Sequence, residues 1–455
     1  MTKYNHLLLL TIFLPIQFGI WASCNSGETV TEKPNSTTDS LFIDHVWTGH
    51  PVGFALLTAP PHQFVAYYDS TRAMIVAQRQ LGETNWKKKQ LPETIGWDSH
   101  NYISLVLDSK GYLHVSGNMH VDPLVYFQAT KPYDVASLVR RLNLIGDLEQ
   151  KATYPHFFDG PDNDLIFTYR DGGSGNGNQI YNRYDPDTGT WTRLLDDPLL
   201  DGQGDMNAYL HGPVLGPDEY YHLIWVWRDT PDASTNHDIS YARSKDLVHW
   251  EQSDGSPQPL PITIENSEII DPVPVQGGMI NGNTVIGFDA DGTLVVSYHK
   301  FDEQGNTQIY NARRETNGWN SYVATDWDFR WDFGGRGSIG KGVGLSPVRF
   351  QNGMLTQQYF VDSLGWRNYR LDPRDLHAVE QLPMDKGFPE QLEAVRSAFP
   401  GMEVHLQTER VPGEGTYVLR WETLSRNRDL PREAPLPPPG ELVLYHFPIG
   451  GSGAQ

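Results

Sequence analysis

The sequence predicts an all-β protein. Its 455 residues include 43 Gly and 32 Pro, which favour many turns, and the periodicity of amphipathic helices is scarce. Aromatic residues make up 12% of the chain, with 13 Trp and 22 Tyr, enough to fill a sizeable core. A unit of strand, polar turn and tryptophan also recurs along the chain. Large single β domains of this length are common, so one domain accommodates the whole repeat.

The repeat predicts the architecture. Its clearest copies are MIVAQRQLGETNW (74–86), QIYNRYDPDTGTW (179–191), ISYARSKDLVHW (239–250) and QIYNARRETNGW (308–319). Weaker copies are LVYFQATKPYDVASL (124–138) and NYRLDPRDLHAV (368–379), and the strands YVLRWETL (417–424) and ELVLYHF (441–447) follow. Intervals of roughly 50–70 residues are typical of four-stranded propeller blades, rather than of a β-sandwich or a parallel β-helix. We therefore predict a seven-bladed β-propeller, a single domain over residues 41–449, whose last blade is completed by the early strand LFIDHVW (41–47).

The first 24 residues have the features of an export signal. Lys3 precedes an apolar run from Leu7 to Trp21, and Ala22-Ser23-Cys24 follows. Cys24 is the only cysteine, so the chain offers neither a disulfide framework nor a cysteine-based zinc site. A cysteine at the cut predicts a lipid anchor, with ordinary secretion as the alternative. Residues 25–40 are expected to form a flexible linker, and the protein to be secreted or held as an outer-membrane or cell-surface lipoprotein.

The charge of the chain limits its partners. A formal net charge of −21 argues against binding to nucleic acid, which needs a basic surface. An acidic polysaccharide would have to meet a local cluster of Arg, Lys or His. We expect a monomer that acts on such an anionic polysaccharide.

Five places carry polar residues beyond what the blades need. Each is by itself more typical of packing, but residues of successive blades converge at one end of a propeller's central channel. The candidate catalytic residues are His100, His120, Tyr154, Arg170 and Tyr209, and the candidate substrate contacts are Asn101, Asn118, Tyr169, Asn178 and His211. His114 lies inside a strand, and His249 is interpreted as a blade residue. FDADGT (288–293) is predicted to be a turn rather than a calcium loop. No cofactor is expected for the chemistry, and a structural metal ion stays open.

These residue types favour one kind of reaction. Arg170 offers a planar fork that matches a carboxylate, and His and Tyr exchange protons. No pair of carboxylates is evident at these places, which counts against two-acid glycoside hydrolysis. A 4-linked uronic acid can instead be cleaved by β-elimination, in which the carboxylate is neutralised, a base removes the C5 proton and an acid protonates the leaving oxygen. A tyrosine beside a guanidinium is expected to have a lowered pKa.

Four long motifs carry a resemblance to a known family. WDSHNYISL, GYLHVSGNMH, YRDGGSGNG and WVWRDTPDASTNHDISYARSKDLVHW resemble segments of the BNR-repeat propeller ulvan lyases, polysaccharide lyase families 24 and 25. The resemblance runs from about Val46 to the end of the chain. It implies cleavage of a sulfated uronate–rhamnose polysaccharide to a 4,5-unsaturated uronate. It also implies that His100, His120, Tyr154, Arg170 and Tyr209, in that order, are the catalytic residues.

Two other functions remain as alternatives. Propeller α-L-rhamnosidases of glycoside hydrolase family 145 share the predicted fold and work at the opposite face with an N-terminal histidine. GHPVGF (49–54) places His50 near that position. A non-catalytic glycan-binding propeller is the third hypothesis. The lyase is favoured because its set is complete at five positions, and under it His50 is a structural residue near the ring closure.

Overall fold

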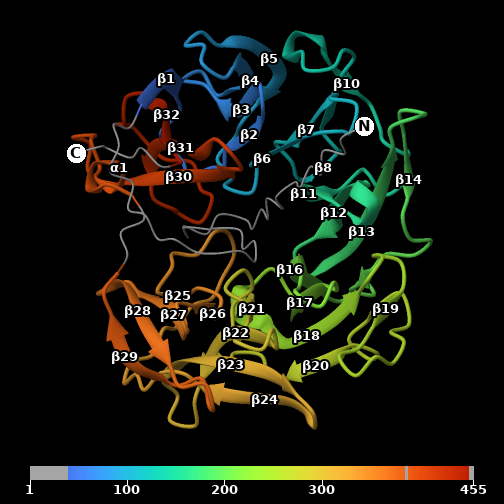
Figure 1. Cartoon of the computed structure of the whole chain (residues 1–455), viewed down its shortest axis with the longest axis vertical. Coiled ribbons are helices and arrows are strands. Elements are labelled where there is room, and N and C mark those ends of the chain that lie inside the picture. Colours follow the sequence, from blue (N-terminus) through green and yellow to red (C-terminus); the bar gives the residue numbers. More distant parts are fainter. Residues whose placement is uncertain (1–38, 385–387, 450–455) are drawn as a thin grey trace.

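The described chain is built from antiparallel sheets arranged in a ring. The structure is a computed structural model that describes residues 39–384 and 388–449. Figure 1 shows the sheets following one another around a common centre in the order of the chain. Helix is confined to α1 (Glu390–Glu393) and the 3₁₀ turns Val135–Ser137, Pro161–Asn163 and Ala233–Thr235 among these residues. The prediction of an all-β protein is confirmed.

Two four-stranded sheets begin the ring. The first contains β2 (Ala55–Ala59), β3 (His62–Tyr68), β4 (Ala73–Gln80) and β5 (Lys87–Thr94), hydrogen-bonded in that order. The second contains β6 (Ile103–Leu107), β7 (Leu113–Gly117), β9 (Tyr126–Ala129) and β10 (Leu138–Arg141), also in chain order.

An eleven-stranded sheet follows, and it contains two antiparallel runs. The first run is β8 (His120–Asp122), β11 (Ala152–Asp159), β12 (Leu165–Gly173) and β13 (Asn176–Asp185), with β14 (Thr190–Arg193) and β15 (Leu200–Asp201) on β13. The second run is β16 (Asn207–Leu215), β17 (Tyr221–Arg228), β18 (Asn236–Ser244) and β19 (Trp250–Glu251), with β20 (Glu268–Asp271) on β18. A single parallel pairing of Gly177 with Asn207 joins the two runs.

Three further sheets complete the ring. They are formed by β21 (Val285–Phe288), β22 (Leu294–Phe301), β23 (Thr307–Glu315) and β24 (Gly318–Val323); by β25 (Val343–Leu345), β26 (Arg349–Gln351), β27 (Met354–Val361), β28 (Gly365–Leu371) and β29 (Ala378–Leu382); and by β30 (Met402–Val411), β31 (Gly415–Leu424), β32 (Gly440–Pro448) and β1 (Asp39–Val46). Because β1 pairs antiparallel with β32, the N-terminal strand completes the last sheet, as the sequence predicts.

The repeat corresponds to one recurring piece of structure. In each clear copy a long strand (β4, β13, β18 or β23) ends and a polar turn follows. The tryptophan then lies within the first two residues of the next strand or, for Trp86, directly before it. Trp191 and Trp250 are buried there, and the Trp191 indole N–H donates to the hydroxyl of Tyr126 on β9 of the neighbouring sheet.

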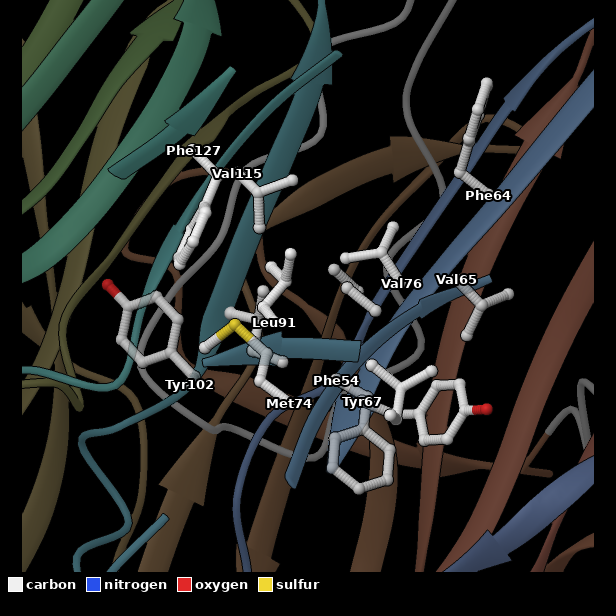
Figure 2. Packing of buried hydrophobic residues seen from close by; sticks show 14 of the residues in the cluster. Phe54, Phe64, Val65, Tyr67, Met74, Val76, Leu91, Tyr102, Val115 and Phe127 are labelled. Atoms are coloured by element: carbon white, nitrogen blue, oxygen red, sulfur yellow. The ribbon is translucent and has the colours of Figure 1, made fainter. Parts of the chain in front are cut away.

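Packing between the sheets supplies the core. Phe54, Tyr67 and Met74 of the first sheet and its approach cluster with Val115 and Phe127 of the second. Figure 2 shows these side chains meeting between the two sheets. Each is at most 1% exposed, so the sheet faces exclude water where they meet.

The predicted N-terminal segments fall largely outside the described residues. The export signal (1–24) with its anchor at Cys24 and most of the linker (25–40) lie there. β1 begins at Asp39, so the last two residues of the expected linker belong to a strand that pairs with β32. No described helix is long and apolar enough to cross a membrane.

Candidate active site

Two histidines share one carboxylate. His100 lies in the connection between β5 and β6, and His120 begins β8. The Nδ1 atoms of His100 and His120 each lie 2.6 Å from a different oxygen of Asp98, and the two rings have centroids 4.2 Å apart. Asp98 also accepts a hydrogen bond from the backbone N–H of His100, an Asx turn that fixes the loop. With Nδ1 held by Asp98, each ring presents Nε2 away from the carboxylate.

The protonation of this group follows from burial and from these bonds. Burial by itself raises the pKa of Asp98, but the hydrogen bonds from both histidines outweigh it and lower that pKa. Burial lowers the pKa of His100, against the opposing effect of Asp98. A second carboxylate, Asp429, lies 3.6 Å from His100 Nδ1. At neutral pH the site therefore contains ionised Asp98 and neutral His100.

A bulge in β11 brings Tyr154 to the histidines. Thr153 pairs with His120 on β8, so the strand pairing itself fixes the distance between the two elements. The register of β11 slips between Thr153 and His156, and Tyr154 has φ 60°, a left-handed conformation that is rare for a bulky residue. The bulge turns the Tyr154 ring toward His100, with the ring centroids 5.7 Å apart.

Arg170 lies behind two tyrosine rings. It pairs with Thr153 across β11 and β12, and its guanidinium lies 4.9 Å from the Tyr154 ring centroid and 5.8 Å from that of Tyr209. Its nitrogens donate to Thr153 Oγ1 (3.2 Å), the Gly172 carbonyl (3.2 Å) and Tyr209 Oη (3.4 Å). Arg170 is only 1% exposed. Three of its five donors are engaged, so the geometry does not present the open fork that the sequence led us to expect.

The glycine-rich segment 172–177, between Arg170 and the end of the β12–β13 turn, packs closely against its neighbours. A Cβ at Gly177 would lie 2.9 Å from Cδ of Arg170, and one at Gly175 would lie 2.6 Å from Cα of Thr230. Gly175 also has φ +77°, which disfavours any side chain. The loop is therefore glycine-rich because Arg170 and the following loop approach its backbone.

Tyr209 extends the site onto β16. Its hydroxyl lies 2.6 Å from Ser174 Oγ, and its ring centroid is 6.3 Å from that of Tyr154. Arg228 lies over its other side, 5.5 Å from the ring centroid. All five candidate catalytic residues therefore lie in one continuous series of contacts.

The expectation of a lowered tyrosine pKa is wrong for Tyr154. Burial raises the pKa of Tyr154, and the nearby Tyr209 raises it further, which outweighs the opposing charges of Arg170 and Arg228. The Tyr154 hydroxyl is therefore protonated at neutral pH, which makes it a proton donor in its resting state.

Two of the candidate substrate contacts are packing residues. Tyr169 is fully buried in the core, and its hydroxyl accepts a hydrogen bond from Arg193. His211 is 3% exposed, and burial lowers its pKa to about 4. Both predictions are wrong, for different reasons. Alternate residues of a strand point to opposite faces, so Tyr169 and Arg170 cannot face the same way. His211 lies two residues from Tyr209 on β16, but its ring is buried.

The three asparagines have local partners. Asn118 donates to Glu93 at 2.8 Å, and Asn178 Oδ1 accepts from the Gly202 N–H at 3.1 Å. Asn101 is 9% exposed, and its backbone carbonyl accepts from the Tyr68 hydroxyl. No contact between these three side chains and the five candidate catalytic residues is present in the described chain, so their role as substrate contacts stays a prediction.

His50 belongs to the same region rather than to an opposite face. It is fully buried, and its Nε2 lies 3.0 Å from Asp429, the carboxylate that also approaches His100. Asp429 additionally accepts from the N–H groups of Ser99 and Ser338. His50 thus supports the connections around the ring closure, and it has no surface through which to act on a sugar.

The donor set was tested for a metal ion. Asp98, His100 and His120 are the only described group of three whose ligand atoms lie within 4.8 Å of one another. Ligands about 2.0–2.1 Å from a tetrahedral zinc ion are roughly 3.3 Å apart, whereas the N–O separations here are 2.6 Å. These are hydrogen-bond distances, so the residues as placed do not form a chelating site.

Two further sequence predictions were resolved. The FDADGT segment is a turn in which Asp289 accepts from the N–H groups of Asp291 and Thr293. His249 lies in the turn before β19, contacts Asp246 and has a side chain that is 87% exposed. Both are structural features of the blades, as predicted.

Three residues of the site were not predicted from the sequence. Asp98 precedes His100 by two residues, and this D-x-H spacing is a signal that was available, because it permits an Asx turn. Asp429 lies more than 300 residues from the histidines, and Arg228 lies at the end of β17, a strand that carries no other candidate residue. Neither therefore has a local sequence signal. The cluster of Arg and His residues therefore contains two carboxylates as well.

Parts of the chain are similar in sequence to known ulvan lyases. A 209-residue segment, 39% of the chain, is 41% identical to the long isoform of ulvan lyase from Pseudoalteromonas sp. (strain PLSV) and covers 18% of that protein. The long isoform of ulvan lyase from Glaciecola sp. (strain KUL10) is 37% identical over 60 residues, 12% of this chain and 6% of that protein. The chain thus matches less than a fifth of the length of these curated relatives.

Solved structures agree in fold. The polysaccharide lyase Uly1 superposes with a TM-score of 0.59 at 13% identity, over 88% of this chain and 90% of that one. An ulvan lyase of polysaccharide lyase family 25 bound to -[GlcA(1-4)Rha3S]- superposes with a TM-score of 0.56 at 13% identity, over 90% of this chain and 95% of that one. The resemblance seen in the sequence is confirmed. The model of the BNR repeat-containing family matches residues 62–327, more than half of the chain, and the protein therefore belongs to that family.

Proposed function

We propose that the protein is a polysaccharide lyase that cleaves ulvan-type polysaccharide at 4-linked uronic acid. One observation carries the proposal: His100, His120, Tyr154, Tyr209 and Arg170 lie in a continuous series of contacts whose histidine end is partly exposed. The similarity to named ulvan lyases supports it.

The protonation states assign roles to these residues. His100 is neutral because burial lowers its pKa, so its Nε2 is the base that takes the C5 proton. The electron pair of that C–H bond forms the C4–C5 double bond, and the bond from C4 to the bridging oxygen breaks. Tyr154, protonated because its pKa is raised, donates a proton to the leaving oxygen. His120 contacts the C6 carboxylate, and Arg170 offsets its charge from behind the tyrosines.

Three variants and two products test this function. The purified protein is incubated with ulvan, and the ultraviolet absorbance of the unsaturated uronate and the release of free rhamnose are both followed. Tyr154→Phe reduces formation of the unsaturated product by about 10²–10⁴-fold, the usual contribution of a positioned proton-transfer group. His120→Ala reduces it by about 10²–10³-fold, because a donor to the negative charge that develops on the substrate carboxylate is lost. His50→Gln leaves the rate largely unchanged, because a glutamine amide can still donate to Asp429.

The alternatives give different outcomes. Rhamnose release that persists in His120→Ala and Tyr154→Phe and is lost in His50→Gln would establish the rhamnosidase. Binding of ulvan without either product would establish a glycan-binding protein. The burial of His50 and the exposure of the histidine pair favour the lyase.

We further infer seven blades in one domain over residues 41–449, with the two antiparallel runs of the eleven-stranded sheet counted as separate blades. Their single parallel pairing at Gly177 and Asn207 supports that count. The apolar run before Cys24 supports export, with a lipid anchor at Cys24 or ordinary secretion. We also propose a monomer that needs no cofactor for its chemistry.

A further inference from the structure

Two successive runs of the largest sheet carry the same pattern of residues. β11 contains Tyr-Pro-His at 154–156, and β16 contains Tyr-Leu-His at 209–211. The strand that follows the first is β12, which contains Tyr-Arg-Asp at 169–171. The strand that follows the second is β17, which ends with Trp-Arg at 227–228 and is followed directly by Asp229. The Tyr–Arg pair described above thus has a second copy, formed by Tyr209 and Arg228.

The two copies match in their contacts. Nε of Arg170 donates to the carbonyl two residues ahead, that of Gly172, at 3.2 Å. Nε of Arg228 donates to the carbonyl of Thr230, also two residues ahead, at 3.0 Å. Each guanidinium lies over the tyrosine of its own copy, at 4.9 Å and 5.5 Å from the ring centroid. Both arginines are therefore held in the same orientation relative to their strands.

The second copy is less complete than the first. Across β11 and β12 the partner of Arg170 is Thr153, whose hydroxyl accepts from the guanidinium. The corresponding partner of Arg228 is Asn207, whose amide nitrogen and oxygen are both buried without a hydrogen-bond partner in the described chain. A buried polar group is normally paired with protein, water or ligand. The Asn207 amide is therefore available to a bound group.

The guanidinium of Arg228 also makes no direct ion pair within the described chain. Its donors reach the carbonyls of Thr230 and Pro231 and the side-chain oxygen of Asn281. No carboxylate of the described chain lies within ion-pair distance of its guanidinium. The charge of Arg228 reaches Asp232 at longer range, where it adds to the backbone hydrogen bonds from Ser234 and Gly335 in lowering the pKa of that carboxylate. A cation whose hydrogen-bond acceptors are all neutral is stabilised by a bound anion, and at 8% exposure Arg228 is more accessible than Arg170 at 1%.

We propose that Arg228 and Asn207 form a second anion subsite, beside the Tyr154–Arg170 pair, that binds an anionic group of a sugar next to the cleaved linkage. The inference rests on the proposed polysaccharide lyase function. The group is an oxyanion, either a sulfate ester or a second uronate carboxylate, because a guanidinium fork matches the oxygens of both.

Ulvan oligosaccharides of one length, native and chemically desulfated, provide the test. Arg228→Gln raises KM on the native substrate by about 10- to 100-fold, the range of a charged hydrogen bond, while kcat stays within about threefold. If the group is a sulfate, wild type and Arg228→Gln have the same KM on the desulfated substrate. If it is a carboxylate, the increase in KM is equal on both substrates.

Arg243→Gln is the matched control. Arg243 lies 4.2 Å from the ring centroid of Tyr220 in the same sheet, but its charge is paired with Glu251 at 2.9 Å. This variant leaves KM unchanged on both substrates. An unchanged KM in Arg228→Gln, or a fall in kcat alone, would overturn the second subsite.

Two measurements keep the result interpretable. Thermal unfolding of Arg228→Gln and of the milder Arg228→Lys shows whether the variants fold, and Arg228→Lys is expected to have an intermediate KM because it keeps the charge without the fork. If wild type forms no unsaturated product, the proposed function fails independently. Calorimetric titration with the same oligosaccharides then still tests the subsite, because equal affinity of wild type and Arg228→Gln would refute it.

Discussion

The histidine pair of the candidate site and the histidines inside the sheets use similar partners but differ in what is left free. His114 Nδ1 lies 2.6 Å from the Tyr126 hydroxyl, and its Nε2 faces Asp108 at 3.5 Å. His222 repeats this arrangement with Tyr241 at 2.7 Å and Asp218 at 2.9 Å. Both rings are buried with each nitrogen facing a partner, so they stabilise the sheets and have no free atom for chemistry.

The pair at Asp98 has only one nitrogen of each ring engaged. Nδ1 of His100 and Nδ1 of His120 contact Asp98, and no partner for either Nε2 is present in the described chain. Their side chains are 20% and 25% exposed. The comparison teaches that a carboxylate partner does not distinguish a structural histidine from a functional one. The free, accessible Nε2 does.

The largest expected effect is that a substitution at the Asp98 pair reduces activity, whereas the same substitution in a buried sheet histidine reduces stability. His100→Gln reduces kcat by about 10²–10⁴-fold and leaves the free energy of unfolding nearly unchanged, because a partly exposed base is removed. His114→Gln lowers the free energy of unfolding by about 1–3 kcal/mol, because the buried Tyr126 hydroxyl loses a partner. Its activity per folded molecule stays near wild type. Denaturant unfolding and initial rates on ulvan measure both quantities.

A stability loss in His100→Gln with normal turnover would reverse the comparison. Tyr126→Phe serves as a second probe of the buried group, because it removes the hydrogen bond to His114 without changing the histidine. It also removes the acceptor of the Trp191 indole N–H, so its loss of stability is expected to be the larger of the two.

Asp98→Asn is expected to have the next largest effect. An asparagine can accept a hydrogen bond from one histidine only, and its amide nitrogen forces the other ring into the tautomer with a proton on Nε2. We expect kcat to fall by roughly 10²-fold or more, since a wrong tautomer removes the base. Asp98 also opposes the lowering of the pKa of His100 by burial, so its loss lowers that pKa further. The acid limb of the rate profile therefore moves to lower pH, and a profile with an unchanged acid limb would remove Asp98 from this role.

A smaller effect concerns the pH dependence of stability. Burial lowers the pKa of His211 to about 4, so the folded protein keeps His211 neutral while the unfolded chain takes up a proton below about pH 6.5. The stability contribution is full above pH 6.5 and is lost as the pH falls toward 4. In His211→Leu the free energy of unfolding is expected to fall by roughly 1–3 kcal/mol less than in wild type between pH 7 and pH 4. The unfolding temperature therefore falls less steeply over the same range. An equally steep fall would show that His211 is already charged in the folded state.

The fold was predictable because its signals are local. The strand, turn and tryptophan of residues 179–191 are consecutive in the chain, and they become β13, its turn and Trp191. The closure of the ring by the strand at 41–47 followed from the need to cover an edge, and β1 does pair with β32.

The site was predictable only in part, because its details depend on three-dimensional burial. The convergence of His100, His120 and Tyr154 followed from the resemblance and from blade geometry. The raised pKa of Tyr154 did not, because it depends on burial beside Tyr209, and neither did the bulge that turns its ring. The strand pattern at 169–170 was available, yet both residues were assigned to the site, although alternation permits only one.

The smallest expected effect belongs to a third kind of histidine. His249 also contacts a carboxylate, Asp246, with Nδ1 2.7 Å from the oxygen, but its side chain is 87% exposed. Its second nitrogen is free, as in the candidate site, yet no tyrosine or arginine accompanies it in the described chain. Exposed pairs of this kind contribute about 0–1 kcal/mol, so His249→Ala changes the free energy of unfolding by less than about 1 kcal/mol and leaves kcat and KM on ulvan unchanged. The variant separates accessibility from catalysis: a large loss of activity would mean that a free Nε2 near a carboxylate is enough, whereas the unchanged rate we expect assigns the chemistry to the histidines that face Tyr154.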